Sequence, residues 1–143
     1  MFVRQISVFV QNRSGAITEV LQVLSAAKIN IRAFSIADTT DFGVLRMILS
    51  DPERAQSVLR EHGIAARVNN VLAVRMTDAP GALYAIMTLL SANEISVEYA
   101  YAFAAKVDGE AFVIIRTDDK EKAEQIFGEH QYSLLSEEDV ANL

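Results

Sequence analysis

The spacing of apolar and polar positions changes along the chain, and these changes predict where strands and helices lie. Residues 6–10 are a short β-branched run typical of a strand, and a polar turn follows as far as Gly15. From 16 to 27 the apolar residues recur at i, i+3, i+4 and i+7, which predicts a helix with one buried face. The same reasoning predicts strands at 31–37, 44–49 and 64–68, a turn at 39–43 and a helix at 52–62.

This order of elements is written twice. Asn12-Arg13-Ser14-Gly15 returns as Asp78-Ala79-Pro80-Gly81, 66 residues later, and Ile29-Asn30-Ile31 returns as Ile95-Ser96-Val97. Further along the offset grows to 68, because one residue is inserted in each connection around the third strand. A repeat of this kind fixes the architecture before any single element does.

The second copy predicts strands at 71–76, 95–104, 111–117 and 132–135 and a helix at 81–92. Val107-Asp108-Gly109 is a hairpin signal, and Asp118 with Glu121 three places later suggests the capped start of another helix. The acidic segment 136–143 is expected to form a last turn or to fray.

Each copy therefore has the order βαββαβ, in which right-handed crossovers place both helices on one face of an antiparallel sheet. The fold class is α+β, with two ferredoxin-like units in tandem. We expect domains at 1–69 and 70–143. Only Asn69-Asn70 separates the last strand of one copy from the first strand of the next, so no flexible linker is expected.

Composition limits the possible partners. The chain of 143 residues is 51% hydrophobic and 22% charged, which is typical of a globular protein. Its net charge of -6 disfavours nucleic acid and anionic membranes as partners. Cysteine is missing from the sequence, so disulfides and thiolate metal sites are excluded. Neither a leader sequence nor an apolar run of membrane length is seen, and a cytoplasmic protein is expected.

Several families share this plan, and the residues discriminate among them. RNA-recognition modules need aromatic side chains on their two central strands and basic surroundings, and ferredoxins need cysteines. By contrast, the run from Val8 to Ile17, followed by Leu24 and Ala27-Lys28-Ile29-Asn30-Ile31, resembles an ACT domain. The second copy carries the Pro80-Gly81 form of the same first loop. The segment 35–43 further resembles stand-alone tandem ACT proteins of bacteria, which have no attached catalytic domain.

The resemblance implies a regulatory module that binds an amino acid with its first loop and the start of its second strand. A helix start offers N–H donors to a carboxylate, and Gly15 lets the backbone approach a ligand closely. An asparagine can accept from an ammonium group and donate to a carboxylate. The candidate binding residues are Asn12, Arg13, Ser14, Gly15, Ala16, Ile17 and Asn30, and in the second copy Asp78, Ala79, Pro80, Gly81, Ala82, Leu83 and Ser96.

Each candidate has a plainer interpretation. Asn12 and Asp78 precede helices, where such residues commonly act as N-caps, and a glycine there is commonly a turn residue. Tyr99, Tyr101 and Phe103 alternate on one strand face, which favours packing over an aromatic pocket. Because the second copy lacks both asparagines, the first copy is expected to hold the stronger site.

No cluster of residues suggests a catalyst, a cofactor or a metal site. We expect a protein that binds an amino acid at a seam between ACT units and signals to a metabolic enzyme. The alternative is a ligand-free interaction module, or a regulatory subunit of an enzyme such as acetolactate synthase. A homodimer is expected because edge strands invite pairing, and Phe34 and Ile36 suggest that the sheet face away from the helices is covered.

Overall fold

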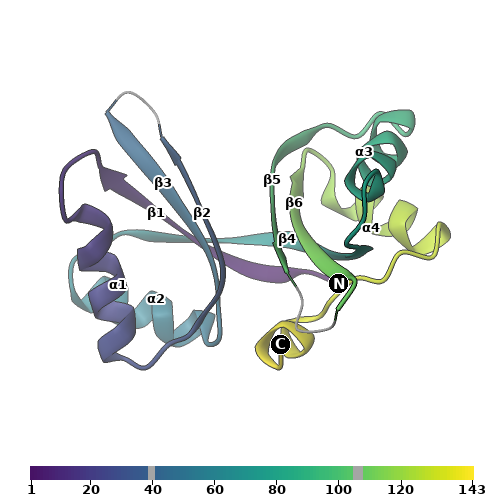
Figure 1. Ribbon diagram of the computed structural model, residues 1–143. Coiled ribbons are helices and arrows are strands. Elements are labelled where there is room, and N and C mark those ends of the chain that lie inside the picture. Colours follow the sequence, from purple (N-terminus) through teal and green to yellow (C-terminus); the bar gives the residue numbers. More distant parts are fainter. Residues whose placement is uncertain (39–40, 105–107) are drawn as a thin grey trace. The chain divides into compact units, whose positions relative to one another are not determined.

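The computed structural model describes residues 1–38, 41–104 and 108–143, and the chain divides into two compact units (Figure 1). The first unit is Arg4–Asn69. The second unit is Asn70–Leu143 together with Met1–Val3. Compactness alone does not define a domain, so the limits 1–69 and 70–143 remain a prediction.

Both units follow the predicted order of strands and helices, except that the last strand of the second unit is only a single bridge, and the predicted fold class is confirmed. The elements are β1 (Val3–Gln11), α1 (Ala16–Ala26), β2 (Ile31–Asp38), β3 (Phe42–Leu49), α2 (Pro52–Glu61), β4 (Ala66–Thr77), α3 (Ala82–Ala92), β5 (Val97–Ala104), β6 (Glu110–Thr117), α4 (Lys120–Glu129) and α5 (Glu137–Ala141).

In the first unit the strand order is β2-β3-β1-β4, and β3 pairs antiparallel with both β1 and β2. Helices α1 and α2 lie on one face of this sheet (Figure 1). The second unit repeats the arrangement, with the order β5-β6-β4 and helices α3 and α4 on one face. A single bridge from Leu134 to Val74 stands in the place of its last strand.

The strand alternation explains the core of each unit. In β1 and β3 the register pairs Ile6 with Met47 and Val8 with Leu45, and all four side chains are buried under the helices. Leu24 of α1 packs into the same cluster. The second unit builds its core from the equivalent positions of β4, β6, α3 and α4, which include Leu72, Val74, Ile86, Leu90, Val113, Ile115 and Phe127.

Three predicted boundaries are wrong. The expected break between two strands at Asn69-Asn70 does not occur, because β4 runs unbroken through both residues. The Ser7 hydroxyl donates to the side-chain oxygen of Asn69 at 3.4 Å. Helix α4 is capped by Asp119 instead of Asp118, whose carboxylate accepts a hydrogen bond from the Ser96 N–H.

The third wrong boundary is the end of the chain. The expected strand at 132–135 is reduced to one bridge, and the segment expected to fray forms α5, which is held by a capping box between Ser136 and Asp139. Residues 39–40 of the predicted turn and Val107 of the predicted hairpin lie outside the described residues. The rest of that turn differs from the prediction, because Phe42 and Gly43 belong to β3.

Two predictions concern side chains that alternate along a strand, and the structure agrees with only one of them. Phe103 packs against Phe112 of β6 with ring centroids 5.3 Å apart, which agrees with a packing role. The interpretation of Phe34 and Ile36 is wrong in its direction. They pair with Met47 and Leu45, so they lie on the helix-bearing side of the sheet, at its β2 edge, and they are 61% and 46% exposed.

Within the described residues, no helix combines the length and the apolar character that crossing a bilayer requires.

Two leucines of α3 give a matched test of this core. Leu90 is fully buried, whereas Leu83 is 42% exposed. We predict that Leu90→Ala lowers the free energy of unfolding by about 2–5 kcal/mol, because it removes buried apolar volume and leaves a cavity. Leu83→Ala should lower it by less than about 1 kcal/mol. Chemical denaturation measures both, and equal losses would contradict the assigned helix face.

Candidate functional site

The first loop of each unit ends in a glycine with left-handed backbone geometry. Gly15 has φ 85° and Gly81 has φ 87°, and these residues are the N-caps of α1 and α3. Neither helix start in the described structure receives a side-chain cap hydrogen bond. The interpretation of Asn12 and Asp78 as helix caps is therefore wrong.

The uncapped helix starts leave backbone donors facing an exposed loop. In α1 the Ala16 N–H reaches the Arg13 carbonyl at 3.3 Å, and the Glu19 N–H donates to the Gly15 carbonyl at 3.0 Å. The N–H groups between them, including that of Ile17, have no cap. Such donors, together with the helix dipole, favour a negatively charged group. The loop can therefore hold a carboxylate without displacing a cap.

A groove of about 190 Å³ runs beside this loop in the first unit and includes two predicted residues, Arg13 and Ala16. The Arg13 guanidinium donates to both carboxylate oxygens of Glu19 at 3.0 and 2.9 Å, and this hydrogen bond and charge raise the pKa of Arg13. Because the pair is exposed, it is worth little in stability, and Arg13 can exchange Glu19 for a ligand carboxylate.

Asn30 lies in a different groove of the same unit, of about 470 Å³. Its walls come from the last turns of α1 and the start of β2, and are formed by Leu21, Leu24, Ser25, Lys28, Ile29, Asn30 and Ile31. The backbone of Asn30 is fixed by Ser50, whose hydroxyl accepts from the Asn30 N–H at 2.9 Å. Asn30 is exposed and stands just before β2, and Lys28 lines the same groove.

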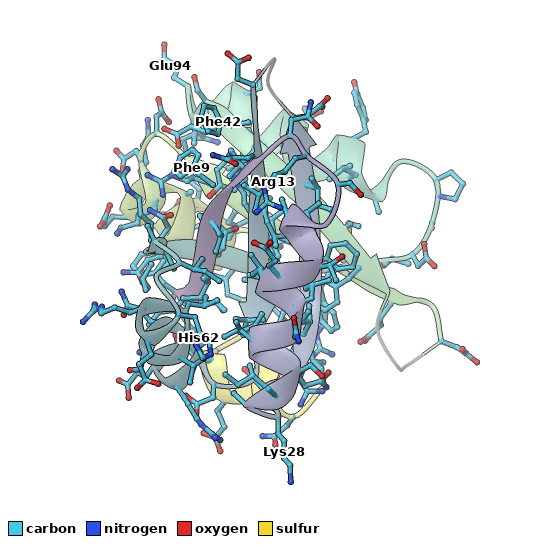
Figure 2. All side chains as sticks on the ribbon, turned by 90° about the vertical axis from the view of Figure 1, so that its left-hand side faces the viewer. Phe9, Arg13, Lys28, Phe42, His62 and Glu94 are labelled. Atoms are coloured by element: carbon cyan, nitrogen blue, oxygen red, sulfur yellow. The ribbon has the colours of Figure 1, made fainter. Side chains whose placement is uncertain are left out.

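The two predicted asparagines do not meet within one unit. Asn12 precedes α1 and Asn30 follows it, and a helix of 11 residues is about 16 Å long. Figure 2 shows Arg13 and Lys28 at the two ends of this helix. One amino acid cannot touch both ends, so a site that contains both asparagines needs parts of two ACT units.

The second unit repeats the geometry with different chemistry. The Ser96 N–H donates to Asp118 at 3.0 Å, in the place of the contact between Asn30 and Ser50. Lys28 and Glu94 both have φ 58°, so they hold equivalent places with opposite charge. Sequence reasoning missed Lys28, although a charge reversal at equal places in a repeat could have pointed to it.

The predicted residues Asp78, Ala79, Pro80, Gly81, Leu83 and Ser96 are exposed in the second unit, and Ala82 is half-buried. The Asp78 N–H donates to the Gly109 carbonyl at 2.9 Å, which ties this loop to the end of the hairpin between β5 and β6. None of these residues lines the groove of the second unit described below. Among the described residues there is also no group of three or more metal-ligating side chains.

Comparison with known proteins agrees with this architecture. All of residues 1–143 match the family model described as an ACT domain pair. The crystal structure of protein BT0572 from Bacteroides thetaiotaomicron is similar with a TM-score of 0.93 and 36% identity, over 100% of this chain and 98% of that chain. A search of curated proteins by sequence finds no match.

More distant structures share the fold. The regulatory subunit of aspartate kinase from Thermus thermophilus, in its ligand-free form, has a TM-score of 0.63 and 14% identity. The corresponding subunit from Thermus flavus has a TM-score of 0.60 and 15% identity. Each comparison covers 88% of this chain and 90% of the other.

The loop glycines can be tested by replacement. No atom lies within 4 Å of a Cβ added at Gly15 or Gly81, so backbone strain is the main cost of a side chain. We predict that Gly15→Ala and Gly81→Ala each lower the free energy of unfolding by about 1–2 kcal/mol. Gly128→Ala, in α4 and equally uncrowded, should raise it by up to about 1 kcal/mol. Denaturant melts decide, and a neutral Gly15→Ala would contradict the strained loop.

Proposed function

Because this chain belongs to the ACT domain pair family, we propose that it is a regulatory protein that binds a free amino acid or a related metabolite. The observation that carries the proposal is the uncapped, glycine-started helix that follows the first loop in each unit. In both units this exposed loop presents backbone donors to a carboxylate, and in the first unit Asn12 adds an amide beside them.

We propose a site at a seam between ACT units, since the two asparagines lie at opposite ends of α1. The loop of Asn12 to Ile17 would hold one end of the ligand. Asn30 and Lys28, from the first unit of another copy of the chain, would hold the other. The second-copy loop, Asp78 to Leu83, would form a weaker site or an opposing wall, because the Asp78 carboxylate repels a carboxylate and attracts an ammonium group.

The regulatory role follows from binding between units. A ligand held by two units stabilises one placement of them over others, and that difference in affinity is what a partner senses. Regulatory subunits of aspartate kinase have the same fold, which supports an enzyme of amino-acid metabolism as the partner. We propose that the chain itself is not a catalyst and acts in the cytoplasm without a cofactor.

One observation favours a second candidate, a ligand-free interaction module such as a regulatory subunit of acetolactate synthase. Phe34 and Ile36 are exposed on the edge strand β2, and Leu21 of α1 is 37% exposed. Apolar side chains along an unpaired edge are typical of a surface that pairs with another chain. This surface serves equally for a second copy of the chain.

The first prediction from this proposal concerns binding. A thermal-shift screen against the twenty amino acids should find one that stabilises the protein, by roughly 2.7 kcal/mol at 100 times its dissociation constant. Isothermal titration should then show that Asn12→Ala and Asn30→Ala each bind that amino acid at least about tenfold more weakly. Each loses charge-assisted hydrogen bonds worth about 1.5–3 kcal/mol.

The control is Asn142→Ala, which removes an exposed asparagine beyond α5 and should leave binding unchanged. Because Asn12 caps no helix, Asn12→Ala should also keep the wild-type melting temperature. If both asparagine variants stay folded and bind as tightly as the wild type, the proposed site is wrong.

The second prediction is a homodimer that uses the β2 edge. Light scattering at micromolar concentration should give about twice the chain mass of 15.8 kDa. Phe34→Lys should shift the protein toward monomer, because a lysine on an edge strand opposes pairing. Tyr84→Lys, on α3, removes an aromatic ring that is 77% exposed and should leave the mass unchanged. A monomeric wild-type protein would contradict the dimer.

A further inference from the structure

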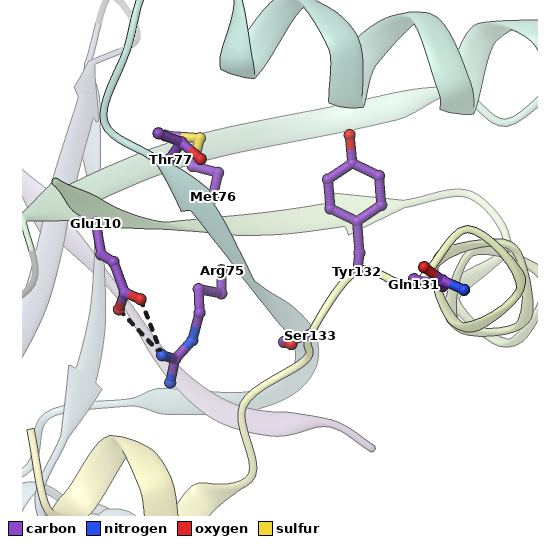
Figure 3. Close-up of a pocket in the computed structure, with 7 residues that line it drawn as sticks. All are labelled: Arg75, Met76, Thr77, Glu110, Gln131, Tyr132 and Ser133. Atoms are coloured by element: carbon purple, nitrogen blue, oxygen red, sulfur yellow. Dashed lines mark hydrogen bonds and ion pairs between the residues drawn. The ribbon is translucent and has the colours of Figure 1, made fainter.

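A groove of about 280 Å³ lies in the second unit, between the end of β4 and the segment that follows α4 (Figure 3). This groove, which we call the Arg75 groove, is lined by Arg75, Met76, Thr77, Glu110, Gln131, Tyr132 and Ser133. The last segment pairs with β4 at one bridge, Leu134 with Val74, and beside that bridge the Arg75 N–H donates to the Ser133 carbonyl at 2.9 Å. Gln131, with φ 61°, turns the chain away at the end of α4.

The first unit has a groove in the equivalent place, the one of about 190 Å³ beside Arg13. Its lining residues Phe9-Val10-Gln11 correspond to Arg75-Met76-Thr77, and Gly63-Ile64-Ala65 correspond to Gln131-Tyr132-Ser133. The hollow is therefore a product of the fold. The side chains differ, because Phe9, Ile64 and Ala65 give way to an arginine, a tyrosine and a serine.

The strand register extends this difference to a charge pair. Gln11 pairs with Phe42 in the first unit, and Thr77 pairs with Glu110 in the second. The positions held by two apolar rings in the first copy, Phe9 and Phe42, are thus held by Arg75 and Glu110 in the second. Of the two copies, only the second places a cation and an anion together at this position.

The Arg75 side chain is held in place from two sides. Its Nη1 donates to both carboxylate oxygens of Glu110, at 3.3 and 3.0 Å, and its guanidinium carbon lies 5.5 Å from the centre of the Phe112 ring. Glu110 thus engages one terminal nitrogen, and the edge formed by Nε and Nη2 suits a second carboxylate. In Figure 3 the guanidinium lies between Glu110 and Ser133.

We propose that the Arg75 groove is a second binding site, which holds the zwitterionic head of a free α-amino acid. The ligand carboxylate would bind the Nε–Nη2 edge of Arg75, with the hydroxyl of Ser133 as a further donor. The ligand ammonium would bind Glu110, whose oxygens have lone pairs beyond those that accept from Arg75. None of the loop residues from Asp78 to Leu83 lines this groove, so the site goes beyond the function proposed above.

The surrounding charge selects a zwitterion over a simple anion. Hydrogen bonds from the Ser136 backbone and side chain lower the pKa of Asp139. The positive charge of Arg75 lowers this pKa further. Arg75 therefore has one carboxylate, Glu110, bonded to it and a second, Asp139, in its electrostatic neighbourhood, in a chain of net charge -6. An anion that lacks an ammonium group would be repelled, whereas an amino acid brings its own compensating charge.

The test is a titration of the full-length, ¹⁵N-labelled protein with each of the twenty amino acids, followed by NMR. At least one should move the amide signals of Thr77, Glu110 and Ser133 saturably. Arg75→Gln and Glu110→Gln should each weaken this binding at least tenfold. Arg75→Lys, which keeps the charge but loses the planar edge, should weaken it at least threefold. Acetate and methylamine, each carrying one half of the head group, should produce no saturable shift.

The matched control is Arg116→Gln. Arg116 forms a similar exposed ion pair with Glu98, at 2.8 Å, outside the Arg75 groove, and its loss should change binding less than twofold. The proposal is overturned if no amino acid moves the groove signals, if Arg75→Gln binds as the wild type does, or if acetate binds as well as the amino acid. Should Arg75→Gln fail to fold, Glu110→Gln and Arg75→Lys decide.

The same spectra separate this proposal from the loop site. Asn12→Ala and Asn30→Ala should leave the shifts of the Arg75 groove unchanged. If an amino acid moves only the loop signals, the proposed function survives and the groove proposal fails. If it moves only the groove signals, the reverse holds.

Discussion

The turn from the first strand into the first helix is the constraint on which the rest of each unit depends. Only four residues separate β1 from α1, and a left-handed residue at their end, Gly15, brings the helix back over the sheet. That direction places Val20 and Leu24 on the buried residues of β1 and β3. The same glycine replaces a side-chain cap, so the turn that completes the core also leaves backbone donors exposed. Packing and binding potential thus share one geometric origin.

The second consequence of this turn is a separation of polar groups. The helix places the first loop at one end of the unit and the start of β2 at the other, so Arg13 and Asn30 line different grooves. In the function proposed here, each groove is one half of a binding site, and a complete site forms only when two ACT units associate. The proposal thus gives a physical reason for ACT units to occur in pairs.

Much of the fold could be predicted from the sequence because the signals were local and repeated. The apolar spacing of 16–27 and the glycines at equal positions in both copies are local sequence signals, and the structure has the helices that they predict. The candidate site was harder to predict, because Asn12 and Asn30 belong to one sequence motif but lie at opposite ends of α1. The unbroken β4 was missed because asparagine is disfavoured in strands, yet β4 runs through both Asn69 and Asn70. The Arg75 groove was missed because its lining residues come from three distant segments and share no sequence pattern.

Comparison of the two copies shows which features the fold requires and which are free to change. Both copies keep the left-handed glycine before the first helix, the buried stripe of that helix and a groove beside the segment that follows the second helix. The side-chain charge differs at exposed positions: Lys28 of the first copy corresponds to Glu94 of the second, and Phe9 corresponds to Arg75. At those places a substitution costs little stability, so a duplicated scaffold can acquire new ligand chemistry in one copy while the other keeps its own. The most informative residues for function in such a chain are therefore the exposed ones at which its halves disagree.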